Sequence, residues 1–315
     1  MNKFIIFFLL TLVFNSLYAN EYIFISPKVS LKMIDKKEIT FLALNDSPLK
    51  IKKSKIINMK TLESSDILGR TGCPSFYLCA TTLEKYFSSL GIKPNEALVL
   101  YDNSYGIDAA TLYALLESMG HKNITILRGG LKDISKLDPN WEIYNNYLNE
   151  LKKDNSKSSK IAQKINILKP HLLLQESTHI STVESNYTVI KTNKNYLLGR
   201  DTLKKAVRKV QQDESNISII DVCEMIDIVN VPSYKMKSLS WRDLIDKEKK
   251  HLKSNEVLEK LFNKLKLNKD EQHYIYCMSG AQKAFYVMMA LRELGYSKVK
   301  AFAGDWNTWE GDINE

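Results

Sequence analysis

The sequence predicts an α/β protein built from two tandem copies of one domain, each a parallel sheet flanked by helices. Two observations lead to this fold class: an internal repeat and, within each repeat unit, the order strand, helix, strand with short connections. Parallel strands need a crossover connection, and a helix packed on the sheet supplies it. The chain of 315 residues is long enough for two domains of ordinary size.

The repeat emerges when the two halves are aligned at a constant offset of 175 residues, which pairs Gly120 with Gly295 and Gly129 with Gly304. The alignment runs without a gap from residue 83 to residue 134. Further matched pairs are Leu83 with Leu258, Phe87 with Phe262, Tyr101 with Tyr276, Ala109 with Ala284, and Leu116 with Leu291. Such a run is improbable by chance and indicates a duplicated domain.

The elements of the second copy begin with a predicted helix over residues 258–265 and a short buried strand over 274–276. Residues 281–294 carry apolar side chains at helical spacing, and Gly295 follows where a left-handed C-cap belongs. The next strand is predicted over residues 299–302. The first copy repeats this order, with a strand over 97–101, a helix over 109–119, Gly120 as its stop and a strand over 124–127.

Composition divides the chain into four parts. We expect a signal peptide over residues 1–19, a first domain over 20–145, a connection over 146–197 and a second domain over 198–315. The stretch 146–164 is rich in Lys, Asn and Ser, which is typical of a linker or a mobile surface segment. The remainder of the connection is expected to pack across the two domains.

Residues 1–19 have the pattern of a secretory signal peptide. Lys3 precedes an apolar run over residues 4–14, and Ala19 ends a short segment suited to cleavage. The run is too short to span a bilayer comfortably, and no later segment is long and apolar enough to cross one. We therefore expect export, to the periplasm in a bacterium, with an uncleaved membrane anchor as the alternative.

The charge balance restricts the partners. The formal net charge is +9, from 45 Lys and Arg against 36 Asp and Glu. The excess is spread over many Lys residues without a basic stripe interleaved with aromatic residues, which argues against nucleic acid as a partner. The positive field favours a small anionic substrate instead, and we expect the protein to be a monomer.

The four cysteines are Cys73, Cys79, Cys223 and Cys277. Their spacing fits no zinc-binding pattern, so no zinc site is expected from the cysteines. In an oxidising compartment, Cys73 and Cys79 could pair across a short loop. Two free, partly buried thiols are the alternative at those positions.

Cys277 is the residue that we expect to carry the chemistry. It ends the predicted strand 274–276 just before a helix, whereas the first copy has Asp102 at this position. Ligands of open parallel sheets bind at the carboxyl ends of the strands. The N–H groups of the loop and the helix dipole would form an anion cradle that favours the thiolate. A buried structural cysteine is the alternative.

The residues expected to bind substrate form the loop after Cys277 and the first turn of the helix. Gly280 allows the backbone to curl tightly around the sulfur, and Lys283 could add positive charge. The full set is Met278, Ser279, Gly280, Ala281, Gln282 and Lys283.

These residues resemble the rhodanese, or thiosulfate sulfurtransferase, family, as a tandem of two rhodanese-like domains. Cys277 with a glycine three residues later resembles the active-site loop of the family. Leu294-Gly295-Tyr296 resembles the helix-to-strand turn of the family, and Ala303-Gly304-Asp305-Trp306 resembles its closing glycine-tryptophan motif. In the first copy, the corresponding steps of the inactive domain of the family are matched by Gly120-His121-Lys122-Asn123-Ile124 and Leu127-Arg128-Gly129-Gly130. The resemblance covers most of the chain after the expected signal peptide.

The resemblance implies a sulfurtransferase in which the Cys277 thiolate attacks the outer sulfur of thiosulfate or a similar donor. A persulfide on Cys277, held by the loop N–H groups of Met278 to Lys283, would then pass its sulfur to cyanide or a thiol. The resemblance implies no metal or organic cofactor.

The sequence departs from the family pattern in the active-site loop, in the Asp-x-Arg motif, and in a His-Ile-Pro-Gly-Ala step whose nearest match is Val231-Pro232-Ser233. Met278 and Ser279 stand where many members carry Arg or Lys, which leaves the choice between thiosulfate and 3-mercaptopyruvate as donor open. The Asp-x-Arg motif of the family reads Asp221-Val222-Cys223, so an expected arginine is missing. Nearby cations could replace it, with solvated surface side chains as the alternative. These cations are Lys235, Lys237 and Arg242.

Asp221 and Cys223 also have predicted roles of their own. We expect Asp221 to be a structural hydrogen-bond acceptor and not an acid–base group. Cys223 follows a neighbouring strand and could approach Cys277 as a resolving thiol, or it could be buried and inert.

Two other classes of function stay open. A rhodanese-like module that binds a partner without catalysis would also explain the departures from the family pattern. A phosphatase with a related cysteine loop needs an arginine fork on the phosphate, and Lys283 stands at that position. Thiocyanate formation by the wild type and not by Cys277→Ser would separate a sulfurtransferase from a binding module.

Overall fold

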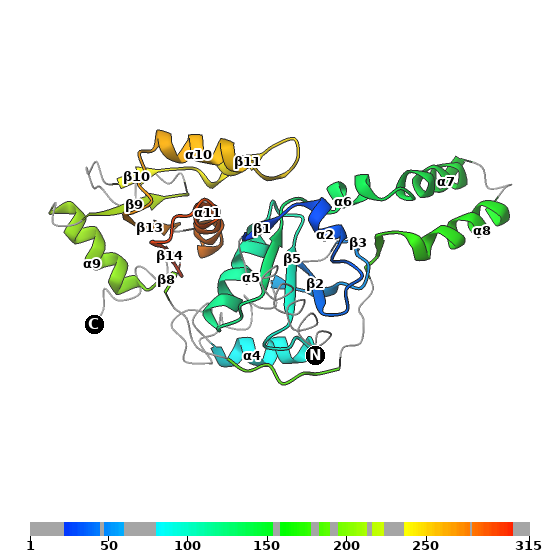
Figure 1. Cartoon of the computed structure of the whole chain (residues 1–315), viewed down its shortest axis with the longest axis horizontal. Helices are drawn as coiled ribbons and strands as arrows, with labels where there is room; N and C mark the ends of the chain where they lie inside the picture. The colour runs from blue at the N-terminus through cyan, green and yellow to red at the C-terminus, as the bar shows by residue number, and fades with distance from the viewer. Residues whose placement is uncertain are drawn as a thin grey trace, which may run out of the picture.

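Two five-stranded sheets, one in each half of the chain, form the framework of the molecule (Figure 1). The computed structural model describes residues 22–44, 47–59, 80–153, 158–177, 183–189, 195–212, 216–223, 236–277 and 279–304. Outside these residues lie the expected signal peptide, both members of the first cysteine pair and part of the predicted site, namely residues 1–19, Cys73, Cys79, Lys235 and Met278.

The first sheet has the strand order β1-β6-β5-β2-β4, and every neighbouring pair is parallel. Its strands are β1 (Phe24–Ile25), β6 (Ile124–Leu127), β5 (Ala97–Tyr101), β2 (Ile39–Leu44) and β4 (Lys55–Ile57).

The second sheet has the order β8-β14-β13-β9-β10 when read from the corresponding edge, and it is parallel throughout. Its strands are β8 (Leu197–Leu198), β14 (Val299–Phe302), β13 (Gln272–Tyr276), β9 (Ile217–Asp221) and β10 (Met236–Ser238). Each strand therefore has its counterpart at the same place in the other sheet. This shared topology confirms the predicted fold class of two tandem α/β domains.

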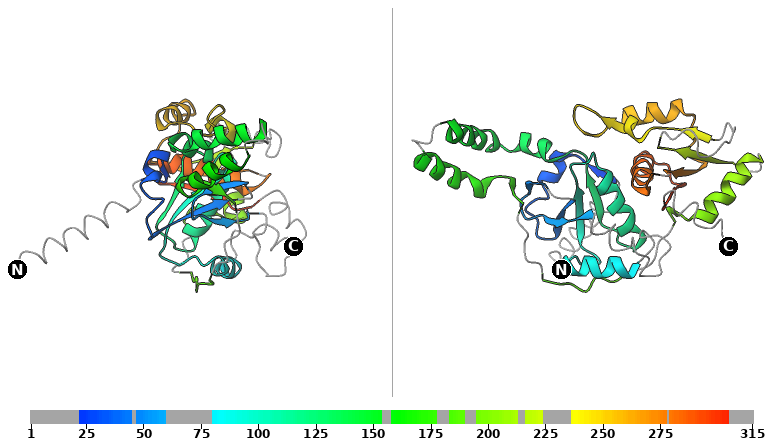
Figure 2. Two further views of the ribbon diagram at one scale, coloured as in Figure 1. Left: turned by 90° about the vertical axis from the view of Figure 1, so that its right-hand side faces the viewer. Right: turned by 180° about the vertical axis from the view of Figure 1, so that it is seen from behind.

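Helices flank both sheets (Figures 1 and 2). Those of the first half are α2 (Pro27–Leu31), α4 (Ala80–Ser89), α5 (Ile107–Ser118) and α6 (Leu131–Leu137). Those of the second half are α9 (Arg200–Gln211), the 3-10 helix η4 (Trp241–Leu244), α10 (Asn255–Lys264) and α11 (Ala281–Glu293), with the antiparallel pair β11 (Ile245–Asp246) and β12 (His251–Leu252) beside them. Within the described ranges, no helix combines the length and apolarity needed to cross a bilayer.

The predicted elements of the repeat are present, with small shifts at their ends. The strands at 97–101, 124–127 and 299–302 have the predicted bounds. Helix α10 begins at Asn255, three residues before the predicted 258–265, with Ser254 at its N-cap position. Gly120 and Gly295 follow α5 and α11 with the same φ of +86°, which confirms the predicted left-handed stops.

The stretch 146–164, which composition indicated as a linker or surface segment, is mostly helical. Helices α7 (Trp141–Lys153) and α8 (Ser158–Leu168) lie side by side and extend away from the first sheet, on the side opposite the second half (Figures 1 and 2). A small apolar cluster of Tyr144, Ile161, Ile165 and Leu172 holds them together. A few apolar side chains on one face are enough to pair two helices, even where Lys and Asn dominate the composition.

The rest of the connection follows the first domain before it enters the second. After the 3-10 helix η3 (Lys169–His171), β7 (Leu174–Glu176) pairs antiparallel with β3 (Leu49–Ile51). Tyr187 stacks on the ring of His121, and its hydroxyl lies 3.1 Å from His121 Nδ1. The described part of residues 165–189 therefore packs against the first domain, and β8 is the first described element to join the second sheet.

Helices α5 and α11, which are equivalent in the two copies, pack against each other between the two sheets (Figure 1). Both are buried along almost their whole length, as expected for helices that are apolar on every side. Their side chains belong to one core cluster that includes residues of both halves. The two domains therefore share a continuous hydrophobic core.

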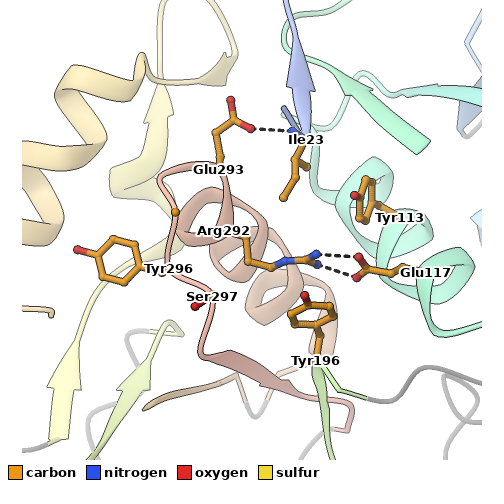
Figure 3. A pocket seen from close by; sticks show the side chains of 9 residues that line it. Ile23, Tyr113, Glu117, Tyr196, Arg292, Glu293, Tyr296 and Ser297 are labelled. Atoms are coloured by element: carbon orange, nitrogen blue, oxygen red, sulfur yellow. Dashed lines mark hydrogen bonds and ion pairs between the residues drawn. The ribbon is translucent and has the colours of Figure 1, made fainter. Parts of the chain in front are cut away.

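Polar contacts close this domain seam at the C-terminal end of α11 (Figure 3). Arg292 donates to both carboxylate oxygens of Glu117 over 2.6 and 2.7 Å, and its guanidinium lies 3.6 Å from the centre of the Tyr196 ring. Glu293 accepts hydrogen bonds from backbone N–H groups at the start of the first domain. A cavity of about 310 Å³ lies beside these side chains, at the end of α11 that is far from Cys277.

Candidate active site

Cys277 lies at the carboxyl end of the central strand of the second sheet. Strand β13 ends at Tyr276, Cys277 follows directly, and α11 begins at Ala281. The Cys277 side chain is fully buried and belongs to the shared core cluster. The corner has the strand–loop–helix arrangement that the sequence predicts, with the sulfur below the protein surface.

Cys223 reaches the same edge of the sheet from the neighbouring strand β9. The parallel register of β9 and β13 places Asp221 beside Tyr276, and each cysteine follows its strand within two residues. The Cα atoms of Cys223 and Cys277 are 5.1 Å apart, and the structure joins their sulfurs as a disulfide. Such a bond usually needs a Cα separation of about 4.4–6.8 Å. The structure thus brings Cys223 to Cys277, as the resolving-thiol hypothesis requires.

Asp221 holds the backbone of Cys223 in place. Its carboxylate accepts a hydrogen bond from the Cys223 N–H over 2.9 Å. Burial raises the pKa of the Asp221 carboxyl, whereas the hydrogen bonds from Cys223 and from the Tyr276 side chain act in the opposite direction. Asp221 is therefore a structural hydrogen-bond acceptor, as predicted from the sequence.

Ser279 and Lys283 connect the two sulfurs to a positive charge. The Ser279 hydroxyl lies 3.2 Å from Cys223 Sγ and 3.3 Å from Cys277 Sγ. Lys283 Nζ donates to the same hydroxyl over 2.7 Å. Burial, and next the charge of Arg242, lower the pKa of Lys283. Within the described residues, no three His, Cys, Asp or Glu side chains gather in a way that could hold a metal ion.

The cations considered as replacements for the missing arginine act on different groups. Arg242 acts electrostatically on Lys283 and lies 4.6 Å from the centre of the Trp241 ring. Lys237 pairs with Ile220 of β9, and burial, together with the Lys237 charge, lowers the pKa of His273. Of the two candidate cations that the structure describes, Arg242 is therefore the one whose charge acts on Lys283 in the first turn after the cysteine loop.

Gly280 makes the tight turn between strand and helix possible. Its φ is +135°, a conformation that residues with a side chain rarely adopt, and its N–H donates to the Cys277 carbonyl over 3.2 Å. A Cβ at this position would lie 2.5 Å from Gln282 Oε1. The predicted reason for a glycine here, a backbone that curls around the sulfur, agrees with this geometry.

The first copy shows how the equivalent corner holds an acidic group. Asp102 follows β5 at the position of Cys277 and is buried. Its carboxylate accepts hydrogen bonds from the N–H groups of Ser104, Gly106 and Ala109 over 2.7, 2.8 and 2.8 Å. Burial, and next a neighbouring carboxylate, raise the pKa of Asp102 to about 6 against the effect of these N–H groups. The alignment of the two repeats identified Asp102 only as the residue at the position of Cys277. It could not show that backbone N–H groups surround the Asp102 carboxylate, because that depends on the loop conformation.

The rhodanese-like domain family matches the chain twice, over residues 73–137 and 227–312. The first match includes Asp102 and the second includes Cys277, so each covers one of the two corners. The chain therefore contains two rhodanese-like domains in tandem. No match to the chain was found among curated protein sequences.

Solved structures share the fold at low sequence identity. The 3-mercaptopyruvate sulfotransferase SseA of Escherichia coli aligns with a TM-score of 0.65 and 18% identity, over 90% of this chain and 99% of that chain. The Tum1 protein of Saccharomyces cerevisiae aligns with 0.62 and 15%, over 93% and 96%. The 3-mercaptopyruvate sulfurtransferase of Leishmania major aligns with 0.61 and 12%, over 93% and 75%. These similarities extend through both domains and establish the fold.

Proposed function

We propose that the protein is a sulfurtransferase that carries sulfane sulfur as a persulfide on Cys277. The donor is a small anion such as thiosulfate or 3-mercaptopyruvate, and the acceptor is a thiol or cyanide. The two rhodanese-like domains and the position of Cys277 at the carboxyl end of a central parallel strand support this assignment.

The observation that carries the proposal is the conformation of the corner in the first copy. There, three backbone N–H groups converge on the Asp102 carboxylate. In the second copy a thiol takes the place of that carboxyl, next to the start of α11, where the N–H groups of the first turn lack partners inside the helix. An anion at Cys277, first a thiolate and then a persulfide, would be stabilised by the same kind of contact.

The proposed reaction has two steps. The Cys277 thiolate attacks the outer sulfur of thiosulfate, the sulfur–sulfur bond of the donor breaks, and sulfite leaves with the electron pair. The acceptor then attacks the outer sulfur of the persulfide, which releases the Cys277 thiolate. Lys283 and Arg242 would supply positive charge to an anionic donor, in place of the arginine that the Asp221-Val222-Cys223 segment lacks.

A rhodanese-like binding module is the second candidate. It is favoured by the full burial of Cys277 and by the bond between its sulfur and Cys223, both of which keep the thiol from a donor. In that case the reduced protein would form no thiocyanate from thiosulfate and cyanide.

The test is the intact mass of the reduced protein after incubation with thiosulfate and, in parallel, with 3-mercaptopyruvate. We expect the protein to react with one of these donors, with a sulfur atom transferred to Cys277. When cyanide is present with the donor, that sulfur should appear as thiocyanate. Cys277→Ser should take up no sulfur, and a wild type that gains no sulfur, forms no thiocyanate and releases no hydrosulfide would exclude the sulfurtransferase.

A further inference from the structure

We propose that Cys223 is a second catalytic cysteine, which discharges the Cys277 persulfide as hydrosulfide and leaves a Cys223–Cys277 disulfide for a dithiol reductant to reopen. This inference rests on the proposed persulfide at Cys277. It adds a class of acceptor, a dithiol, and a product, hydrosulfide, to the reaction. The protein would then act as a reductase of sulfane sulfur as well as a sulfurtransferase.

The two thiols are held together by the pairing of adjacent strands. Strands β9 and β13 pair from Gln272 beside Ile217 to Tyr276 beside Asp221, so their carboxyl ends are level. Beyond the last pair, the Val222 N–H donates to the Tyr276 carbonyl over 3.1 Å. This contact continues the parallel pairing up to the cysteines, whose Cα atoms are 5.1 Å apart. The approach of the sulfurs is therefore set by the sheet and not by a long loop.

The Cys223 segment is also fixed from its other side. The N–H groups of Leu239 and Trp241 donate to the carbonyls of Asp221 and Val222 over 2.9 and 3.2 Å. The Asp221 carboxylate in turn accepts the Cys223 N–H. A thiol with its backbone bound on both sides needs little reorganisation to react with its neighbour.

The first copy lacks both thiols. At the offset of 175 residues, Cys277 corresponds to Asp102 and Cys223 corresponds to Pro48. The two cysteines are thus found together in one domain and absent together from the other. This pattern is expected when the second thiol works with the first.

The discharge step balances without an outside oxidant. The Cys223 sulfur attacks the inner sulfur of the persulfide, Cys277 Sγ, and a bond forms between the two Sγ atoms. The bond from Cys277 Sγ to the outer sulfur breaks, and the outer sulfur leaves with the electron pair. The thiol proton of Cys223 ends on this departing sulfur, which becomes hydrosulfide. The Ser279 hydroxyl, within 3.3 Å of both Sγ atoms, is placed to pass that proton.

The disulfide must then be reduced by two electrons, which a dithiol reductant supplies. Cys223 is partly exposed whereas Cys277 is fully buried, so the reductant attacks the Cys223 sulfur and Cys277 is the leaving thiolate. The reductant ends as its own disulfide, and both cysteines return to their reduced forms. The difference in exposure between the two cysteines therefore sets the direction of attack.

The test compares the reduced, full-length wild type with Cys223→Ser in the absence of air and of any added acceptor. Each protein receives thiosulfate or 3-mercaptopyruvate, and hydrosulfide and intact mass are measured. The wild type should release one hydrosulfide for each Cys277 that reacts, and its mass should fall by two hydrogens. Cys223→Ser should retain the added sulfur atom and release no hydrosulfide, although cyanide should still convert that sulfur to thiocyanate.

Controls separate the possible results. Wild type without donor must keep both thiols, and peptide mapping of the reacted wild type must locate the Cys223–Cys277 bond even if Cys223→Ser folds poorly. A wild type that keeps its extra sulfur and releases no hydrosulfide overturns this inference and leaves the sulfurtransferase intact. Equal release by Cys223→Ser overturns it as well. If neither protein takes sulfur from either donor or yields hydrosulfide, the proposed function itself fails.

Discussion

Cys277 and Asp102 stand at equivalent corners of the two domains, and their contacts differ. Asp102 accepts hydrogen bonds from backbone N–H groups of its own loop, whereas Cys277 has a second cysteine from the adjacent strand within bonding distance. The Asp102 carboxyl accepts hydrogen bonds at this corner but forms no covalent bond, whereas a cysteine sulfur can exchange one covalent sulfur partner for another. At the scale of single residues, the fold is therefore the same in both copies and the chemistry is not.

The cradle around Asp102 predicts the effect of Asp102→Asn. The amide can accept at its oxygen, but its NH₂ group would face an N–H donor, which should destabilise the protein by about 1–3 kcal/mol. Denaturant unfolding of the two proteins at one pH measures this difference. An equal free energy of unfolding would show that the carboxylate contacts contribute nothing.

The difference in unfolding free energy between the wild type and Asp102→Asn should also depend on pH. Because the pKa of Asp102 is raised from 3.8 to about 6, its stabilising contribution is complete below its ordinary value and is lost as the pH rises through about 6. The stability advantage of the wild type over Asp102→Asn should therefore shrink between about pH 4 and about pH 6 and change little above that. Unfolding titrations across this range check the sign, and an advantage that grows with pH would contradict it.

Gly280 predicts a second effect at this scale. Gly280→Ala should cost about 1–3 kcal/mol, because a residue with a side chain is strained at the φ of +135°. Sulfur loading of Cys277 should fall with it. Gly199→Ala is the matched control, since nothing lies within 4 Å of a Cβ there and its φ is −80°. Similar unfolding free energies for both variants would argue against strain at Gly280.

Part of the site could be predicted from sequence, and the missing part has a physical reason. Cys277 and Gly280 follow from a local pattern of strand, turn and helix. The contact of Cys223 with Cys277 depends on the register of β9 against β13, which is set by pairing between residues far apart in the chain. The sequence could raise that contact only as one of two alternatives.

At the scale of elements, α5 and α11 do most to join the domains, and one side chain between them is poorly matched to its surroundings. Tyr286 of α11 is fully buried, and among the described residues its hydroxyl has no hydrogen-bond partner. Burial, and next the Asp102 carboxylate, raise the pKa of this phenol. A buried hydroxyl without a partner costs free energy, so its removal should not harm the fold.

Tyr286→Phe should accordingly leave the free energy of unfolding unchanged or raise it by about 1 kcal/mol. Tyr101→Phe is the matched control, because the Tyr101 hydroxyl donates to Ser54 and accepts from the Ile51 N–H, both over 2.9 Å. The control should lose about 1–3 kcal/mol. Thermal and denaturant unfolding of the two variants measures both values, and a large loss in Tyr286→Phe would reveal a partner for its hydroxyl.

The helices α7 and α8 show where composition misleads at this scale. The strands of the repeat are short, mostly buried segments between turn residues, which sequence patterns detect well. The helix pair has many Lys and Asn residues, and its packing face includes Leu172 from beyond α8. Because such helices are stabilised mainly by packing of an apolar face, the average composition of the segment does not reveal them.

At the scale of the whole molecule, the domain seam is made by equivalent surfaces of the two copies. Glu117 and Arg292 are separated by 175 residues, the offset of the repeat, so equivalent positions of α5 and α11 meet. Their side chains are 17% and 12% exposed, which makes this a largely buried ion pair. Loss of one partner from such a pair leaves an uncompensated charge.

A charge exchange tests this pair. Glu117→Arg sets two cations against each other and Arg292→Glu sets two carboxylates against each other, so each should cost about 3–5 kcal/mol. The double variant restores opposite charges at the same two positions and should recover much of the loss, but not the stacking of Arg292 on Tyr196. Denaturant unfolding of all four proteins gives the coupling energy, and simple addition of the two losses would rule out the pairing.

This pair also limits how the two halves can associate when they are apart. Separate copies of either half that docked symmetrically through this helix would place the side chain at this position against its own duplicate, glutamate on glutamate or arginine on arginine. Both arrangements repel, whereas the covalently joined halves attract. The Glu117–Arg292 pair therefore disfavours dimers of either isolated domain and favours association of the two different domains of one chain.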